Sequence, residues 1–124
     1  MREIDSYTKT CIKYFESGCK GNTMIAAKDG EVRVYLHANF IYSQTFDTEV
    51  FTLAGWNTNV TRNRLNACLK DSYVFQKNYT PYLKYKGHDI ELDDGKYYKH
   101  VGCDWFSSDS EWGETWAPIT WEMC

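Results

Sequence analysis

Hydrophobic and polar positions alternate along this 124-residue chain with two different periods. In residues 2–17 the apolar side chains recur every three or four positions, which predicts an amphipathic helix that ends at Gly18. From residue 22 onward the apolar runs are short and turn residues separate them, as is typical of strands. The apolar stripe of the predicted helix consists of Ile4, Tyr7, Cys11, Tyr14 and Phe15.

The first β-like runs predict an antiparallel meander of three or four strands. Residues 24–27 and 32–36 flank Asp29-Gly30, and Asp-Gly between apolar runs is a strong hairpin signal. Within the second run, apolar residues alternate with others, so one face of that strand is expected to be buried. Runs at residues 40–46 and 49–53 follow, joined by a turn near Asp47-Thr48.

A second helix is predicted near residues 61–70, with Thr61 or Asn59 as its N-cap. Residues 73–76, 82–85 and 90–92 are extended between turn residues. The segment from Cys103 is expected to be irregular, apart from a last strand within residues 116–121.

These elements predict the fold class α+β, in which the central helix packs on an antiparallel β-meander. One domain is expected to span residues 1–124, a usual size for one hydrophobic core. Its parts are the N-terminal helix segment (1–21), the β-rich body (22–102) and a C-terminal segment rich in Trp and acids (103–124).

Composition favours a cytoplasmic protein. The N-terminus lacks the apolar region of a signal peptide, and no run approaches the ~18 apolar residues of a membrane span. Five cysteines are an odd number and are widely spaced, which favours reduced thiols over disulfides. The glycosylation sequons at Asn59 and Asn78 are therefore interpreted as chance matches. The expected location is the cytoplasm, either of a bacterium or of the host cell of a virus.

Charge is distributed unevenly. Residues 1–99 carry 14 basic and 12 acidic side chains, whereas residues 100–124 carry five acids and no Lys or Arg. Four of the five Trp residues lie in that acidic end. Trp anchors many protein interfaces, and carboxylates steer toward basic surfaces, so this end predicts binding to a basic partner. The alternative is that the rings close the core, which is expected for about half of them. The candidate partner-binding residues are Trp105, Asp109, Glu111, Trp112, Glu114 and Trp116.

Three motifs follow one another in the centre of the chain: VYLHANFI at residues 34–41, LAGWNT at 53–58 and TRNRLN at 61–66. Over residues 22–76 the chain resembles a family of small bacteriophage proteins with an LHGN-x-I strand, an AGW-x-T turn and a T-T-[RK]-x-R-[LI]-N helix start. Ala38 stands where that family usually has glycine, and Val60 stands where it has the first threonine. The N-terminal helix and the Trp-rich end look like additions. The resemblance implies a phage origin and no particular activity.

The block at residues 55–66 allows two interpretations. In the favoured one it is a corner of the fold, in which Trp56 plugs the junction between sheet and helix and polar residues bond free backbone groups. In the other, the helix N-terminus with Arg62 and Arg64 holds an anion such as a phosphate.

Metal binding and catalysis lack a local signature. His100 and Cys103 form one H-x-x-C pair that His88 and Cys124 would have to complete, whereas structural zinc normally shows two tight pairs. The usual nucleophile, phosphate-loop, metalloprotease and dinucleotide motifs do not occur. We therefore expect no enzyme activity, no metal and no cofactor.

Residues 76–86 interleave lysines with aromatic rings, as single-strand binders do. The cations are few and the whole chain is acidic, which favours a solvated strand face instead. Together with the two arginines above, the candidate residues for nucleic-acid or anion binding are Arg62, Arg64, Lys77, Tyr79, Tyr82, Lys84 and Lys86.

The sequence favours a non-enzymatic phage accessory protein that binds the basic surface of a host protein through its acidic, Trp-rich end. Host takeover or inhibition of host defence is the expected purpose. A small nucleic-acid or nucleotide-binding module is the alternative, and a structural role in the virion is also open. No membrane partner is expected.

Overall fold

The structure, a computed structural model, describes residues 2–112 and 115–119. The helices are α1 (Glu3–Tyr14) and α2 (Asn59–Cys68). The strands before α2 are β1 (Gly18–Lys20), β2 (Thr23–Lys28), β3 (Glu31–Leu36), β4 (Asn39–Gln44) and β5 (Thr48–Thr52). The strands after α2 are β6 (Ser72–Lys77), β7 (Thr80–Tyr85), β8 (His88–Glu91), β9 (Tyr97–Val101), β10 (Asp104–Ser108) and β11 (Ala117–Pro118).

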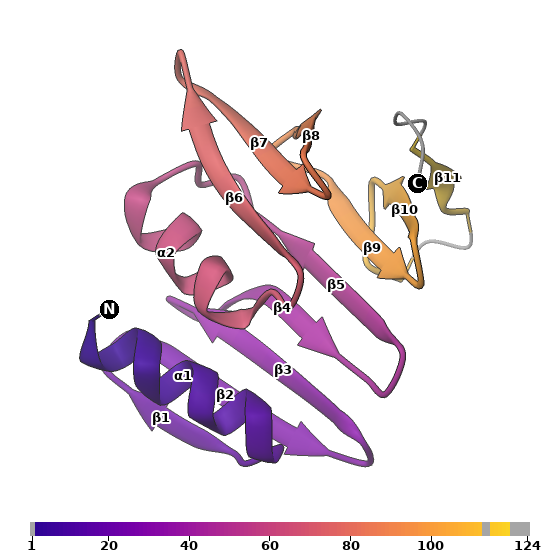
Figure 1. Cartoon of the computed structure of the whole chain (residues 1–124). Coiled ribbons are helices and arrows are strands. Elements are labelled where there is room, and N and C mark those ends of the chain that lie inside the picture. Colours follow the sequence, from indigo (N-terminus) through magenta and orange to yellow (C-terminus); the bar gives the residue numbers. More distant parts are fainter. Residues whose placement is uncertain (1, 113–114, 120–124) are drawn as a thin grey trace.

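Two antiparallel sheets carry these strands, which confirms the α+β class and the meander. The large sheet has the order β1-β2-β3-β4-β5-β9-β10-β11, and the small sheet has the order β6-β7-β8. Figure 1 shows α1 and α2 next to each other on one side of the large sheet. Neither helix is long and apolar enough to cross a membrane.

The core lies between that side of the large sheet, the two helices and the small sheet. In β3, Val32 and Val34 are fully buried, whereas Arg33 between them is half-buried on the opposite face. Leu65 of α2 and Leu83 of β7 join the same core cluster. Burial of these side chains is the main stabilising contribution, because each large apolar side chain removed from water contributes about 1.5–3 kcal/mol of free energy.

Helix α1 ends earlier than the sequence predicts. Tyr14 is its last residue, and Phe15 takes a left-handed conformation (φ 52°) that closes it. Tyr14 and Phe15 are exposed, so their place in the apolar stripe was wrong. Gly18 belongs to β1 and is needed for packing, because a Cβ there would collide with the hydroxyl of Tyr7.

Helix α2 confirms the second predicted helix but begins two residues earlier, at Asn59. Its N-cap is Thr58, whose Oγ1 accepts a hydrogen bond from the Thr61 N–H at 3.2 Å, so neither predicted N-cap was right. Near the end of α2, Asn66 bonds both the N–H and the C=O of Val74, at 2.7 and 2.9 Å. The side-chain amide of Asn66 thus satisfies backbone groups at the edge of β6 that a neighbouring strand would otherwise bond.

Among the remaining strands, the Asp29-Gly30 hairpin is confirmed, since both residues have positive φ as a tight I′-type turn requires. β1, β9 and β10 were not predicted. In β9 the inward-facing residues are Tyr98 and His100, so the buried face lacks the aliphatic alternation that marks a strand. The predicted last strand is short: β11 covers two residues, and residues 120 and 121 lie outside the described part.

Candidate functional site

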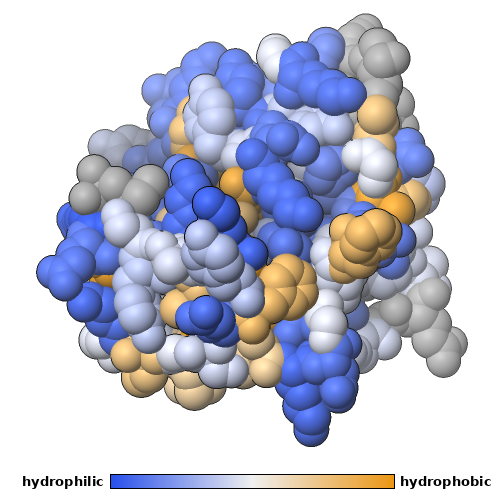
Figure 2. Space-filling view, turned by 60° about the horizontal axis from the view of Figure 1, so that its bottom comes forward, coloured by the Kyte–Doolittle hydropathy of each residue, from blue (hydrophilic) through white to orange (hydrophobic). Residues whose placement is uncertain are grey.

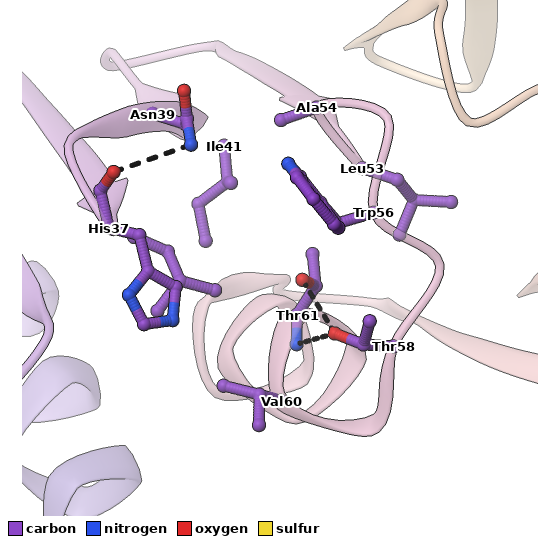
Figure 3. Close-up of a pocket in the computed structure, with 10 residues that line it drawn as sticks. His37, Asn39, Ile41, Leu53, Ala54, Trp56, Thr58, Val60 and Thr61 are labelled. Atoms are coloured by element: carbon purple, nitrogen blue, oxygen red, sulfur yellow. Dashed lines mark hydrogen bonds between the residues drawn. The ribbon is translucent and has the colours of Figure 1, made fainter.

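An apolar cavity of about 430 Å³ opens where the β3–β4 hairpin meets the start of α2 (Figure 3). Leu36, Ile41 and Leu53 form its aliphatic floor and are almost completely buried. Aliphatic walls with a few polar groups at the edge are the ordinary form of a binding site. The full lining consists of Leu36, His37, Asn39, Ile41, Leu53, Ala54, Trp56, Thr58, Val60 and Thr61.

Two strained turns shape this cavity. His37 and Ala38 connect β3 to β4 with φ angles of 51° and 66°, and Ala54 follows β5 with a φ of 55°. Left-handed backbone is unfavourable for residues other than glycine, and it is concentrated at functional sites. The Asn39 side chain steadies the first turn, because its Nδ2 donates to the His37 carbonyl at 3.3 Å.

Trp56 forms a wall of the cavity and does not plug the sheet–helix junction. Its side chain is 61% exposed, which corrects the favoured sequence interpretation. Backbone bonds fix the loop: the Trp56 N–H donates to Leu53 at 2.8 Å, and the Thr58 N–H donates to Trp56 at 2.9 Å. In Figure 3 the indole stands on the far side of the cavity from His37, and the start of α2 lies between them. The loop thus presents a large ring to solvent beside an apolar hollow.

Arg62 ties this loop to the small sheet. Its guanidinium donates to the side-chain oxygens of Asn57, of Asn59 at 2.6 Å and of Gln76 at 3.2 Å. Burial lowers the pKa of Arg62. Asn57 in turn donates to Gln76 at 3.1 Å and to the Tyr79 carbonyl at 3.4 Å. Three amide side chains therefore take up the donors that the anion hypothesis assigned to a ligand.

Arg64 cannot serve an external anion, so that part of the sequence prediction was wrong. Its side chain is 2% exposed and forms a buried ion pair with Asp5 of α1. Its Nε also donates to the Thr23 hydroxyl at 2.9 Å. Arg64 points into the interior because Cys68, one helical turn further along α2, faces the core on the same side. It connects α2, α1 and β2.

The outward side of the small sheet carries two of the other nucleic-acid candidates, Tyr82 and Lys84. The ring centroid of Phe75 lies 5.6 Å from that of Tyr82, and Tyr73 lies 5.9 Å from Phe75. Lys84 forms an ion pair with Asp89 at 2.6 Å, which neutralises the central cation of this face. Nucleic-acid binding here remains a prediction.

The remaining small-sheet candidates sit at opposite ends of β7. Lys77 and Tyr79 lie at the β6–β7 turn, where Tyr79 is 90% exposed with a φ of 65°. Lys86 lies at the β7–β8 turn, with its Nζ 3.4 Å from Cys103 Sγ. The structure does not gather Arg62, Arg64 and these residues into one site.

The acidic end is divided between core and surface. Trp105 is 1% exposed and stacks on His100 with centroids 4.3 Å apart, so its assignment to a partner interface was wrong. It is buried because β10 pairs with β9 and turns Trp105 inward. Trp112 is 77% exposed and Asp109 is exposed, whereas Trp116 is half-buried.

The acidic surface also has a partner within the chain. Glu111 binds the guanidinium of Arg33 with both carboxylate oxygens, at 2.7 and 2.9 Å. This hydrogen bond, which outweighs desolvation, raises the pKa of Arg33 well above its ordinary range. The charge that was expected to face an external basic surface is thus in part neutralised internally. Glu114 lies outside the described residues.

A second polar cluster is buried around Glu49, and all its hydrogen bonds are made within the fold. Glu49 accepts from the Tyr42 hydroxyl at 2.6 Å and from the Lys70 N–H at 3.1 Å, and it lies 3.3 Å from His100 Nδ1. Burial alone would raise the pKa of Glu49, but the bonds from His100, Tyr42 and Lys70 prevail and lower it. Among the described residues, no group of three or more His, Cys, Asp or Glu side chains has metal-ligand geometry.

On the side of the molecule seen in Figure 2, surface hydrophobicity is scattered. On the face shown in Figure 2, hydrophobic residues form small separate areas among hydrophilic ones. Single exposed rings also occur at turns, such as Phe46 and Tyr79. Isolated rings of this kind are normal on protein surfaces. The cavity differs because it combines an exposed ring with a hollow.

Sequence reasoning singled out the residues around the cavity without seeing the cavity. All three motif segments contribute to the lining. The first contributes Leu36, His37, Asn39 and Ile41, the second Leu53, Ala54, Trp56 and Thr58, and the third Thr61. Their spatial meeting depends on tertiary packing, which periodicity does not report. A tryptophan next to a glycine, Gly55-Trp56, was the signal available in the sequence, and the tryptophan was interpreted as a core plug.

Comparison with known proteins gives a family and nothing closer. Residues 1–112 match the Kyanoviridae Gp96 protein family. The chain matches no curated protein and no solved structure. The matched region includes α1, both sheets up to β10 and the whole cavity. The phage resemblance of the central motifs is thus confirmed and extends further than those motifs, and the chain belongs to the Kyanoviridae Gp96 family of bacteriophage proteins.

Proposed function

We propose that this phage protein is a non-catalytic binding protein that captures a partner protein of the host through the cavity beside Trp56. An apolar side chain of the partner enters the cavity, and the backbone of the partner next to that side chain packs against the exposed indole of Trp56. The observation that carries the proposal is the combination of a cavity of about 430 Å³ with a tryptophan that is 61% exposed at its edge.

The chemistry around the cavity matches the energetic centre of protein interfaces. Trp, Tyr and Arg dominate such centres, and they act beside pockets that exclude water. Tyr79 is joined to the Trp56 loop through Asn57, and Arg62 holds the same loop in place. A preformed loop loses little conformational entropy when a partner docks on it.

The lining favours binding over catalysis. Its ten residues include one ionisable side chain, His37, and otherwise offer aliphatic groups, hydroxyls, one amide and the indole of Trp56. General acid–base catalysis usually relies on two positioned groups, and a nucleophile requires a neighbouring base. An apolar anchor, by contrast, needs only the shape and dryness that these residues provide.

In a phage-infected cell, such capture would serve host takeover or the inhibition of a host defence protein in the host cytoplasm. The exposed acids Asp109 and Asp104 lie outside the cavity lining and would add long-range attraction toward a basic partner. The anchor itself is expected to be neutral and apolar, because none of the ten lining residues that the structure describes carries a carboxylate.

The test is capture from host lysate by affinity-tagged protein, with and without nuclease, followed by mass spectrometry. Wild type, Trp56→Ala and Trp112→Ala are compared, because Trp112 is also exposed but lies away from the cavity lining. A protein retained by wild type and Trp112→Ala, lost with Trp56→Ala and resistant to nuclease supports the proposal. Equal recovery by all three variants, or recovery of nucleic acid alone, contradicts it.

A further inference from the structure

The face of the large sheet turned away from the helices, here called the outer face, carries a row of aromatic rings. Tyr35 lies 6.1 Å from Phe40, and Phe40 lies 6.3 Å from Tyr97, between ring centroids. Cations share this face with the rings: the register of β3, β4, β5 and β9 places Arg33 and Lys99 in one cross-strand row. Rings beside cations are the chemistry of surfaces that bind single nucleic-acid strands.

The segment after β10, here called the tail (residues 109–112 and 115–119), turns back across the outer face. Glu111 accepts two hydrogen bonds from Arg33, and the centroid of the Trp112 ring lies 5.3 Å from the Arg33 guanidinium carbon. Lys99 Nζ lies 4.6 Å from the Trp116 ring. Each of the two cations in the row therefore contacts a residue of the tail.

We infer that the outer face is a binding surface for single-stranded nucleic acid, and that the tail occupies it as an internal substitute for the strand. The Glu111 carboxylate offers Arg33 two oxygens in the fork geometry that a phosphate also offers. Trp112 contacts the guanidinium as a stacked base does. The rings of Phe40 and Tyr35 lie on the same guanidinium, with centroids 4.4 and 5.7 Å from its carbon, and Tyr97 extends this row as a further stacking position for a base.

Two observations distinguish this arrangement from a simple cover of the sheet. Trp112 is 77% exposed, so its stacking on Arg33 buries little apolar area and adds little to the core. The chain from residue 100 onward contains no Lys or Arg, so the tail has the negative charge and planar rings of a nucleic acid without any balancing cation. Glu31, the other acid near Arg33, lies further away, at 3.4 Å.

The experiment measures the anisotropy of a fluorescein-labelled oligothymidylate of about 12 nucleotides at about 50 and 200 mM salt. Glu111→Gln removes the carboxylate that pairs with Arg33. This variant is expected to bind the oligonucleotide at least about tenfold more tightly than wild type does, with stronger salt dependence. Asp109→Asn removes the same charge from an exposed position of the tail and is the matched control, expected to bind as wild type does. Adding Arg33→Gln to Glu111→Gln should abolish the gain.

Circular dichroism melting confirms that each variant is folded. Equal binding by Glu111→Gln and Asp109→Asn overturns the inference, since the effect is then one of net charge. It is also overturned if a synthetic peptide of residues 107–118 binds Glu111→Gln while the oligonucleotide does not, because the outer face is then a peptide site. The cavity beside Trp56 is not involved, so Trp56→Ala should leave oligonucleotide binding unchanged.

Discussion

The two ends of the block at residues 55–66 are a few residues apart in sequence and differ completely in their surroundings. At the C-terminal end, Arg64 is ion-paired, Leu65 is in the core and Asn66 closes the edge of β6. At the N-terminal end, the Trp56 ring is mostly in solvent beside a cavity. One end satisfies its polar groups and buries its apolar ones, and the other leaves apolar surface unused.

This difference separates stability from function within one short segment. Polar groups that are buried and paired are costly to disturb, because breaking a pair leaves an uncompensated group. An exposed ring beside a cavity stabilises the folded chain little and is available to a partner. The contrast predicts large losses of stability at the Arg64 end and small ones at the Trp56 end.

The largest effect is expected from Arg64→Ala. It leaves Asp5 buried without its partner, which typically costs about 3–5 kcal/mol in the free energy of unfolding. Denaturant unfolding measures the loss. Lys70→Ala, an exposed cation just after α2, is the control and should change stability by no more than about 0.5 kcal/mol. Equal stability of the two variants would show that the Arg64–Asp5 ion pair does not stabilise the folded chain.

A smaller, pH-dependent effect is expected at Glu49. Its pKa is lowered in the folded state, so its contribution to stability is present above the unfolded pKa of about 4.3 and is lost as the pH falls through the folded pKa. Glu49→Gln should lower stability by about 1–3 kcal/mol at pH 7 and flatten the acid side of the profile. Unfolding free energies between pH 3 and pH 7 provide the measurement. Parallel profiles for variant and wild type would contradict this account.

At the cavity, Ala38→Gly should increase stability by about 1 kcal/mol. Ala38 has a φ of 66°, which glycine adopts without the steric penalty of a Cβ. Thermal unfolding measures the gain. Ala26→Gly, within β2 at ordinary strand φ, is the control and should lose stability by a similar amount. A loss at both positions would show that the turn is not strained.

Much of the fold could be predicted from sequence because its signals are local. The Asp29-Gly30 turn and the alternation around Val32 and Val34 define a hairpin without reference to the rest of the chain. The pairing of β5 with β9 could not be predicted, because the 44 residues between Thr52 and Tyr97 leave no local trace of it. The burial of Trp105 could not be predicted for the same reason, since it depends on the pairing of β10 with β9.

The candidate site was predictable only in part, and for a related reason. Charge patterning identified Glu111 as acidic but could not reveal that Arg33, far away in sequence, is its partner. Helix-start chemistry identified Arg62 and Arg64 together, although the helical turn sends one toward the loop and the other into the core. Whether a polar residue serves the fold or a ligand depends on its neighbours in space.

The smallest effect on stability, and the most informative measurement, concerns Trp56→Ala. With 61% of the side chain already exposed, the free energy of unfolding should change by no more than about 1 kcal/mol. The affinity for the partner captured from host lysate, measured by titration calorimetry with purified proteins, should fall about thirtyfold or more, as for an interface anchor worth 2 kcal/mol. An unfolding loss of about 3–5 kcal/mol, or an unchanged affinity in a folded variant, would contradict the proposed role of the cavity.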